Sequence, residues 1–179
     1  NRLGVISNSA DNIADYYPDG IVEIWRDIDN VSRGLIGWDF YGSMPLVGDG
    51  VYFKITDDTK HDIVSLNVKD GNWYVNSTDT GVAAETGYIY FSIKADLDNK
   101  TATLVLNGQQ IGETFTVNDG IASRVYIGSG KETTAVIQML RCDVYKDYPV
   151  NDIFLQPKGS PLSGWEVTGS AEVAHTGGQ

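Results

Sequence analysis

Tyrosines and basic residues recur on one side of several alternating segments, and this pattern has the clearest chemical meaning in the sequence. Between residues 88 and 96, polar positions alternate with apolar ones. A period of two means that one face of a strand is buried and the other is wet. The wet positions of this segment and of residues 51–56 and 122–128 include Tyr52, Lys54, Tyr88, Tyr90, Lys94, Arg124 and Tyr126.

Such side chains suit the binding of a saccharide. Aromatic rings stack against the C–H faces of sugar rings, while cations and carboxylates hydrogen-bond to hydroxyl groups. If the strands are neighbours in one sheet, these residues form a single ligand-binding face. The alternative is that they are ordinary cross-strand pairs on an exposed sheet, because tyrosine favours strands.

The tryptophans divide by their surroundings. Trp38 shares its face with Ile36 and Phe40, which predicts a core position. Trp25 lies on the same face as two acidic residues and is expected to be partly wet. For each of the three a core position is favoured over a ligand-binding one, because tryptophan is usually mostly buried. Trp73 follows the turn residues 70–72, so of the three it is the one most expected to be exposed, at the rim of the binding face.

The charge balance excludes one class of partner. The net charge is −11 and the isoelectric point is about 4.4, so a nucleic acid would be repelled and is not expected as a partner. The basic residues on the wet faces favour a polysaccharide that is itself acidic, although the net charge opposes long-range attraction. The acidity itself is consistent with solubility outside the cell.

Acidic clusters predict one structural calcium ion. Carboxylates and backbone oxygens are the ligands that calcium prefers, but no cluster matches the twelve-residue calcium loop, and each one alone is more typical of a turn. We expect Asp143, near the end of the last long strand, to meet Asp19 or Asp27 if the terminal strands pair. No phosphate-binding or dinucleotide-binding motif is present, so no organic cofactor is expected.

Catalysis has weaker support. Glycoside hydrolysis needs two carboxylates about 5–10 Å apart, and Glu23 and Asp27 lie on one face of the same segment. In a catalytic domain, either a lyase or a glycosidase, Glu23, Asp27, Tyr90 and Arg124 would be the candidate residues. His61 falls in a predicted turn, whereas a polysaccharide lyase of the jelly-roll type would need a histidine in a strand.

The single cysteine, Cys142, excludes an internal disulfide. It lies in an apolar segment, where a lone thiol usually packs as a small hydrophobic group. A catalytic thiol would need a nearby histidine, and both histidines lie elsewhere. The sequence therefore predicts a buried, unreactive thiol.

The remaining pattern predicts an all-β fold. Turn signals such as Asn107-Gly108 separate alternating segments at intervals of roughly eight to twelve residues, the rhythm of an antiparallel two-sheet sandwich or jelly roll. A single helical turn is possible at residues 9–15. The predicted strands are residues 2–7, 20–28, 34–40, 51–56, 62–68, 72–76, 88–96, 101–106, 110–117, 122–128 and 135–145.

The composition changes near residue 148. We expect a jelly-roll domain over residues 1–148 and a linker rich in Pro, Gly and Ser over residues 149–164. Residues 165–179 read either as the start of a following β module or as a terminal edge strand of the first domain. No apolar run approaches the ~18 residues that a membrane span needs, and the chain is expected to be a piece of a longer protein.

Two segments resemble a known superfamily. The strand YIYFSIKAD followed by DNKTATLVLNG, and the late strand MLRCDVY, resemble the laminin-G-like, or concanavalin A-like, jelly rolls over residues 1–148. The glucanases on this fold carry Glu-x-Asp-x-x-Glu, which is absent here. The resemblance implies a non-catalytic carbohydrate-binding module in a larger secreted or cell-surface bacterial enzyme, with other modules of the same polypeptide as neighbours. Such domains also serve in adhesion or structural roles that contact protein, and this alternative stays open.

Overall fold

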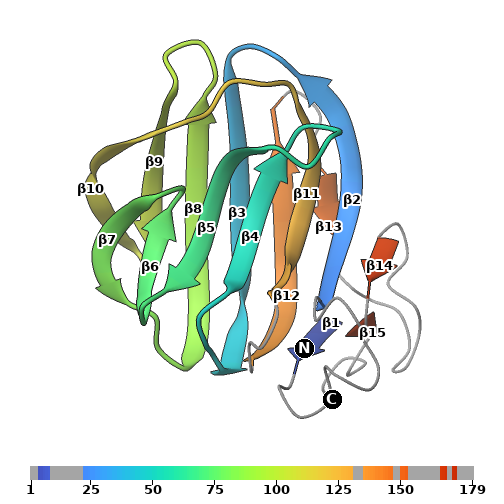
Figure 1. Cartoon of the computed structure of the whole chain (residues 1–179), viewed down its shortest axis with the longest axis vertical. Coiled ribbons are helices and arrows are strands. Elements are labelled where there is room, and N and C mark those ends of the chain that lie inside the picture. The colour runs from blue at the N-terminus through green and yellow to red at the C-terminus, as the bar shows by residue number, and fades with distance from the viewer. Residues whose placement is uncertain are drawn as a thin grey trace.

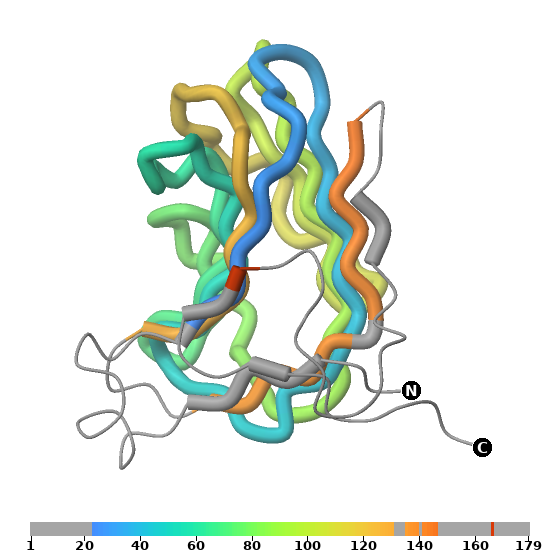
Figure 2. The backbone as a smooth tube through the Cα atoms, turned by 90° about the vertical axis from the view of Figure 1, so that its right-hand side faces the viewer, coloured from blue at the N-terminus to red at the C-terminus, as the bar shows by residue number. Residues whose placement is uncertain are grey.

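Two antiparallel sheets packed face to face make up the computed structural model of this chain (Figures 1 and 2). The structure describes residues 4–8, 22–130, 135–146, 150–152, 166–168 and 171–172. The predicted all-β sandwich of jelly-roll type is confirmed. No helix within these described ranges is long and apolar enough to cross a membrane.

The first sheet, called sheet A, lies behind the other in Figure 1. Its strand order is β10 (Gln109–Thr116), β9 (Thr101–Leu106), β8 (Gly87–Asp96), β3 (Leu35–Leu46), β12 (Ala135–Tyr145), β1 (Gly4–Asn8) and β15 (Ala171–Glu172). The short strand β13 (Val150–Asp152) also pairs with β12.

The second sheet, called sheet B, carries the candidate functional site. Its strand order is β14 (Glu166–Thr168), β2 (Val22–Val31), β11 (Ala122–Ser129), β4 (Val51–Thr56), β5 (Asp62–Lys69), β6 (Asn72–Val75) and β7 (Thr78–Ala83). Figure 2 shows the two layers from the side.

Aromatic rings from both sheets meet in the core. Phe53 of sheet B lies 4.8 Å from Phe40 and 4.9 Å from Phe91 of sheet A, measured between ring centroids. Trp38 packs edge-on against Phe53 and Phe91. Burying a side chain of this size contributes about 1.5–3 kcal/mol, so this cluster is a main source of the attraction between the sheets.

The turns follow the predicted chemistry. Asn107 and Gly108 have φ angles of 49° and 84°, the left-handed region that a two-residue hairpin turn requires. The side chain of Asn107 also accepts a hydrogen bond from the backbone nitrogen of Tyr90 at 2.9 Å. In the turn after β8, Asp96 accepts from the backbone nitrogens of Asp98 and Asn99.

Each predicted strand overlaps an observed one, with two notable differences. Strand β7 was not predicted, because residues 78–83 are mostly polar and exposed, as expected at the edge of a sheet. Strand β3 runs to Leu46, beyond the predicted end at residue 40, and pairs along this extension with β8 and β12. The expected helical turn at residues 9–15 lies outside the described residues.

The segments predicted as linker and following module contribute short strands to the sandwich. Strand β14 pairs with β2 at the edge of sheet B, and β15 pairs with β1 at the edge of sheet A. Strand β13 pairs with β12. The division into domain, linker and following module stays a prediction.

Candidate functional site

The outer face of sheet B carries polar side chains in rows that cross neighbouring strands. The register pairs Tyr126 of β11 with Trp25 of β2 on one side and with Lys54 of β4 on the other, and Lys54 pairs in turn with Ser65 of β5. Facing residues on neighbouring strands lie about 4.5–5.5 Å apart. The row therefore lies on one side of sheet B.

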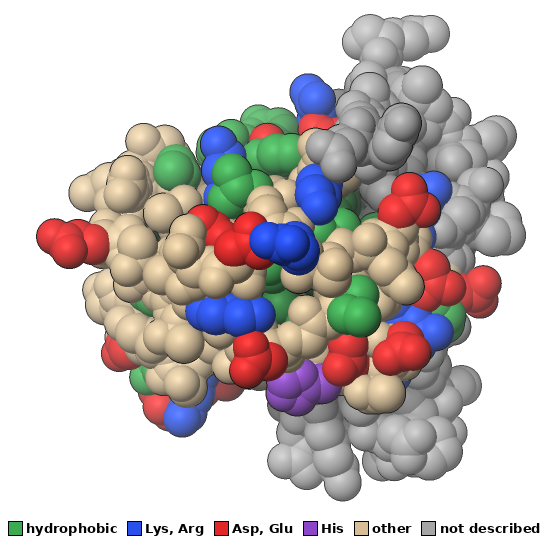
Figure 3. Space-filling model, turned by 90° about the horizontal axis from the view of Figure 1, so that it is seen from above, with side chains coloured by type: hydrophobic (Ala, Val, Ile, Leu, Met, Phe, Trp, Pro, Cys, Tyr) green, Lys and Arg blue, Asp and Glu red, His purple; other side chains and the backbone are tan. Residues whose placement is uncertain are grey.

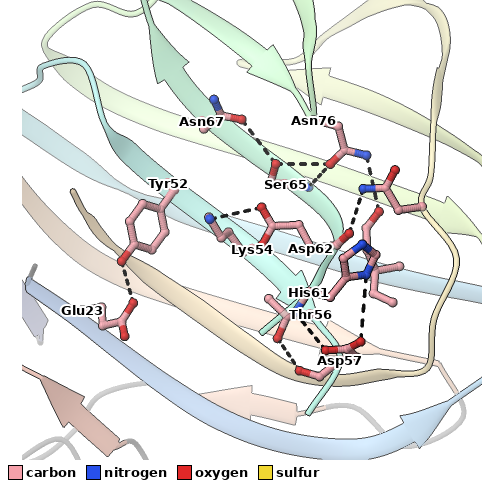
Figure 4. Close-up of polar contacts among 12 residues, drawn as sticks. Glu23, Tyr52, Lys54, Thr56, Asp57, His61, Asp62, Ser65, Asn67 and Asn76 are labelled. Carbon is pink, nitrogen blue, oxygen red and sulfur yellow. Dashed lines mark hydrogen bonds and ion pairs between the residues drawn. The ribbon is translucent and has the colours of Figure 1, made fainter. Parts of the chain in front are cut away.

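A groove of about 490 Å³ lies on this face, over β4 and β5. Figure 4 shows several of its side chains. Amide, hydroxyl and charged side chains are prominent among its lining residues: Gly50, Tyr52, Lys54, Asp62, Ser65, Asn67, Val68, Asn76, Ser77, Asn118 and Gly130.

Hydrogen bonds hold one wall of the groove in place. The Oδ1 of Asn76 accepts from the backbone nitrogen and the hydroxyl of Ser65, at 2.8 and 3.2 Å. The Nδ2 of Asn76 donates to the carbonyl of Thr116 at 2.7 Å. The Ser65 hydroxyl also approaches Oδ1 of Asn67 at 3.3 Å, while the Asn67 amide nitrogen has no hydrogen-bond partner among the described residues. Asn67 therefore offers a donor to a ligand.

An ion pair forms another part of the wall. The Nζ of Lys54 lies 3.1 Å from Oδ2 of Asp62, with each side chain about one-third exposed. The same Nζ lies 4.8 Å from the centroid of the Tyr52 ring. The pair therefore presents a donor and an acceptor side by side without adding net charge.

Tyr52 is held by a carboxylate from a strand that is not its neighbour. Its hydroxyl donates to Oε2 of Glu23 at 2.6 Å, and Nζ of Lys60 donates to Oε1 at 3.0 Å (Figure 4 shows the first contact). Gly128 of β11 pairs with both Glu23 and Tyr52. Because glycine has no side chain, the tyrosine can reach across β11 to the carboxylate.

The surroundings of Tyr52 and Lys60 keep both side chains protonated. Burial, and then the hydrogen bond to Glu23, raise the pKa of Tyr52 far above its usual value. The Glu23 carboxylate also raises the pKa of Lys60. Tyr52 is therefore a neutral donor fixed on Glu23, and both oxygens of Glu23 are occupied.

Over β2 and β11, the basic side chains of Arg124 and Lys60 lie on the aromatic rings of the outer face. Arg124 donates to Oδ1 of Asp27 at 2.6 Å, and its guanidinium carbon lies 4.8 Å from the centroid of Trp25. The Nζ of Lys60 lies 5.0 Å from the centroid of Tyr126, and Trp25 stacks on Tyr126 at 6.0 Å. Trp25 is partly buried, and Tyr126 is only 2% exposed.

The structure divides the predicted binding residues between two faces. Tyr52, Lys54, Arg124 and Tyr126 lie on sheet B, whereas Tyr88, Tyr90 and Lys94 lie on β8 of sheet A. The prediction of one face that contains them all is wrong, because β8 pairs with β3 and β9, not with β4 or β11.

Two of the predicted side chains are not accessible. Trp73 is 2% exposed and packs in the core with Val75, so its expected position at a rim is wrong. The alternation of buried and partly exposed residues along β6 points it inward, and this outweighs its closeness to a turn. Tyr126 is on the outer face as predicted but is covered by Trp25 and Lys60.

The predicted calcium ligands do not come together. Asp27 faces outward from sheet B and pairs with Arg124, whereas Asp143 is on sheet A and pairs with Arg141. Their expected meeting is therefore wrong, because the two sheets separate them. Asp19 lies outside the described residues. Within the described part of the chain, no group of three acidic, histidine or cysteine residues could hold a metal.

Comparisons with known proteins match the architecture. The chain is similar to a sialidase structure, with 11% identity over 74% of this chain and 15% of that one and a TM-score of 0.62. It is also similar to a SAP-like pentraxin from Limulus polyphemus, with 11% identity over 97% and 96% of the two chains and a TM-score of 0.53. The fold is a concanavalin A-like jelly roll.

A further match is an alginate lyase from Corynebacterium sp., with 11% identity, a TM-score of 0.48, and coverage of 68% of this chain and 61% of that one. The jelly roll described here spans only 15% of the length of the sialidase. No family model and no curated protein sequence matches the chain.

Several groove residues were not predicted from the sequence. Asp62, Ser65, Asn67, Asn76 and Asn118 line the groove together with Tyr52 and Lys54. Ser65 and Asn67 alternate with Val64, Leu66 and Val68, so their wet side was readable from the sequence. Serine and asparagine attract less notice than tyrosine or lysine, and only the fold shows that they face Tyr52 and Lys54.

Proposed function

We propose that this jelly roll binds a polysaccharide through the groove of sheet B, without cleaving it. The observation that carries the proposal is the wall of closely spaced amide, hydroxyl and paired charged groups around about 490 Å³ of open space. Sugar hydroxyls both donate and accept hydrogen bonds, and this wall offers both kinds of partner. The similarity to a sialidase structure supports a glycan-related role.

The groove favours a neutral glycan. The prediction of an acidic ligand depended on Lys54, Lys94 and Arg124. Asp62 and Asp27 already neutralise Lys54 and Arg124, and Lys94 lies on the other sheet. Each hydrogen bond to a ligand contributes about 0.5–1.5 kcal/mol net. A shallow site with few such bonds is expected to bind in the micromolar to millimolar range.

The positions of the catalytic candidates support binding without cleavage. Tyr90 lies on the other sheet, and Glu23 and Asp27 are engaged by basic residues.

We further propose that the jelly roll acts outside the cell, as a module of a larger glycan-active protein. Many polysaccharides are found at or beyond the cell surface, and the acidic composition of the chain is compatible with that setting. The small share of the sialidase that the chain spans supports a modular role. A structural calcium ion stays a prediction, which a comparison of the melting temperature (Tm) with and without a chelator would test.

A glycan array followed by affinity electrophoresis tests the proposal. We expect retention by at least one polysaccharide, and we expect Asn67→Ala to weaken it about 2- to 10-fold, which corresponds to one lost hydrogen bond. The matched control is Asn30→Ala, an exposed residue outside the groove. Reducing-end and unsaturated-product assays on the bound glycan should detect no cleavage.

Two outcomes would contradict the proposal. Product formation would show a catalytic domain. A protein ligand found in place of any glycan would support the adhesion role instead.

A further inference from the structure

A second cluster of polar and aromatic side chains lies on the outer face of sheet A, on the opposite side of the sandwich from the groove. The register places Arg141, Tyr41 and Tyr90 in one row across β12, β3 and β8, and Asp143 beside Asp39 in the next row. A small cavity of about 150 Å³ is lined by Asp39, Phe40, Tyr41, Tyr90, Arg141 and Asp143.

The largely buried carboxylate of Asp143 belongs to the lining of this cavity. Its side chain is 10% exposed, and its Oδ2 accepts a hydrogen bond from Nε of Arg141. The buried Oδ1 has no hydrogen-bond partner among the described residues. A buried acceptor without a partner is costly and uncommon in folded proteins. A ligand that donates a hydrogen bond to a reoriented Asp143 carboxylate would remove that cost.

Exposed rings surround the cavity. Tyr41 is 42% exposed and Tyr90 is 38% exposed, although both are large aromatic residues. Tyr88 stacks on Tyr41 with an interplanar angle of 6°. This stacking fixes the Tyr41 ring on the surface, so it can serve as a preformed platform for the face of a flat apolar group.

The charges of the cavity select the class of ligand. The lining residues carry two carboxylates and one guanidinium, so an anion is disfavoured, while the same groups offer both acceptors and donors. A pair of adjacent hydroxyl groups satisfies both signs, because each hydroxyl can donate to a carboxylate and accept from the guanidinium.

We propose that this cavity is a second saccharide site, which takes a neutral sugar ring through two adjacent hydroxyls. One hydroxyl donates to the Asp143 carboxylate, and Tyr41 and Tyr90 contact the C–H faces of the ring. The site stands on residues separate from those of the groove in sheet B. A module with sites on opposite faces would bridge two glycan chains, or bind one chain twice with increased avidity.

Fluorine NMR on protein labelled with 3-fluorotyrosine distinguishes the two faces. Signals from Tyr41, Tyr88 and Tyr90 report on sheet A, whereas those from Tyr52 and Tyr74 report on sheet B. The probes are the neutral methyl glycosides of glucose, galactose and mannose, with methyl glucuronide as the acidic counterpart and glycerol as the control for solvent effects.

We expect a neutral glycoside to shift the sheet A signals in a saturable manner. Tyr90→Ala should weaken this binding about 2- to 10-fold, the loss of one stacked ring, and Asp143→Asn should weaken it further. Lys94→Ala, on the same strand as Tyr90 but outside the cavity, should leave it unchanged. The Tyr90 variant keeps the test valid if Asp143→Asn fails to fold.

Three results would overturn the inference. The sheet A signals could stay unmoved by every neutral glycoside, they could respond only to methyl glucuronide or equally to glycerol, or Tyr90→Ala could bind as the parent does. Failure of the groove in sheet B would appear separately, as unmoved signals from Tyr52 and Tyr74.

Discussion

The hydroxyl of Tyr52 donates a hydrogen bond to Glu23 at 2.6 Å across the intervening strand β11. The glycine at position 128 leaves the space for this contact, and Glu23 is 6% exposed. The hydrogen bond therefore links β2 to β4 across β11, at one end of the groove. It also explains why a tyrosine at the groove is fixed in place.

Removing the Tyr52 hydroxyl should destabilise the fold. In Tyr52→Phe, the buried Glu23 carboxylate loses a partner, which we expect to lower the free energy of unfolding by about 1–2 kcal/mol. For a domain of this size, each kcal/mol lowers Tm by about 2–4 °C. Urea unfolding and calorimetry measure both quantities.

The control for Tyr52→Phe is Tyr74→Phe. The Tyr74 hydroxyl contacts the exposed side chain of Asp79 at 3.4 Å, so its removal should change stability little. Equal losses in the two variants would mean that the contact between Tyr52 and Glu23 contributes nothing specific.

Replacing Trp73 should test its position in the core. Trp73→Ala removes a ring that is 2% exposed and packs against Phe53, so we expect a loss of about 3–5 kcal/mol in the free energy of unfolding. Trp25→Ala, on the outer face, should cost clearly less. If Trp73→Ala retained the stability of the parent and lost only glycan binding, Trp73 would be a ligand residue after all.

Stability should fall in acid, below about pH 4. Hydrogen bonds lower the pKa values of three aspartates. The main donor is the Thr59 hydroxyl for Asp57, the Gly81 backbone nitrogen for Asp79 and the Asn99 backbone nitrogen for Asp96. Because the unfolded chain takes up these protons first, near pH 4, the stabilisation is complete above that pH. It is lost as the pH falls through the lower folded values.

A series of Tm measurements between about pH 2 and pH 6 tests this dependence, since the loss of stability is expected to begin near pH 4. Asp57→Asn should have a lower Tm than the parent at neutral pH and should lose less as the pH falls. Asp58→Asn, a change in the exposed neighbour, should follow the parent curve. A parent Tm that stayed constant across this range would refute the prediction.

Cys142 should be unreactive in the folded protein. Its side chain is 0% exposed, and its sulfur accepts a hydrogen bond from the indole nitrogen of Trp38 at 3.1 Å. Ellman's reagent should therefore detect no thiol in native buffer and one thiol per chain in denaturant, since the sequence contains one cysteine. Rapid reaction in native buffer would mean that the strand around Cys142 opens readily.

The sequence by itself determined the fold class and the side of each strand that its residues occupy. The alternation of apolar and polar residues is a local property with period two, and it correctly placed Phe53, Phe91 and Cys142 in the core. Turn chemistry is also local, so the turn at Asn107 and Gly108 was predicted, and both residues have positive φ angles in the structure. The same alternation in β6 was a readable sign that Trp73 points inward.

Only the tertiary structure decided which polar faces belong together. An apolar face buries equally well against many partners, so the pattern of one strand does not name its neighbours. The pairing of β8 with β3 and of β4 with β11 therefore separated Tyr90 from Tyr52 by the whole thickness of the sandwich. The covering of Tyr126 by Trp25 and Lys60, and the contact of Tyr52 with Glu23, depend on the same long-range pairing.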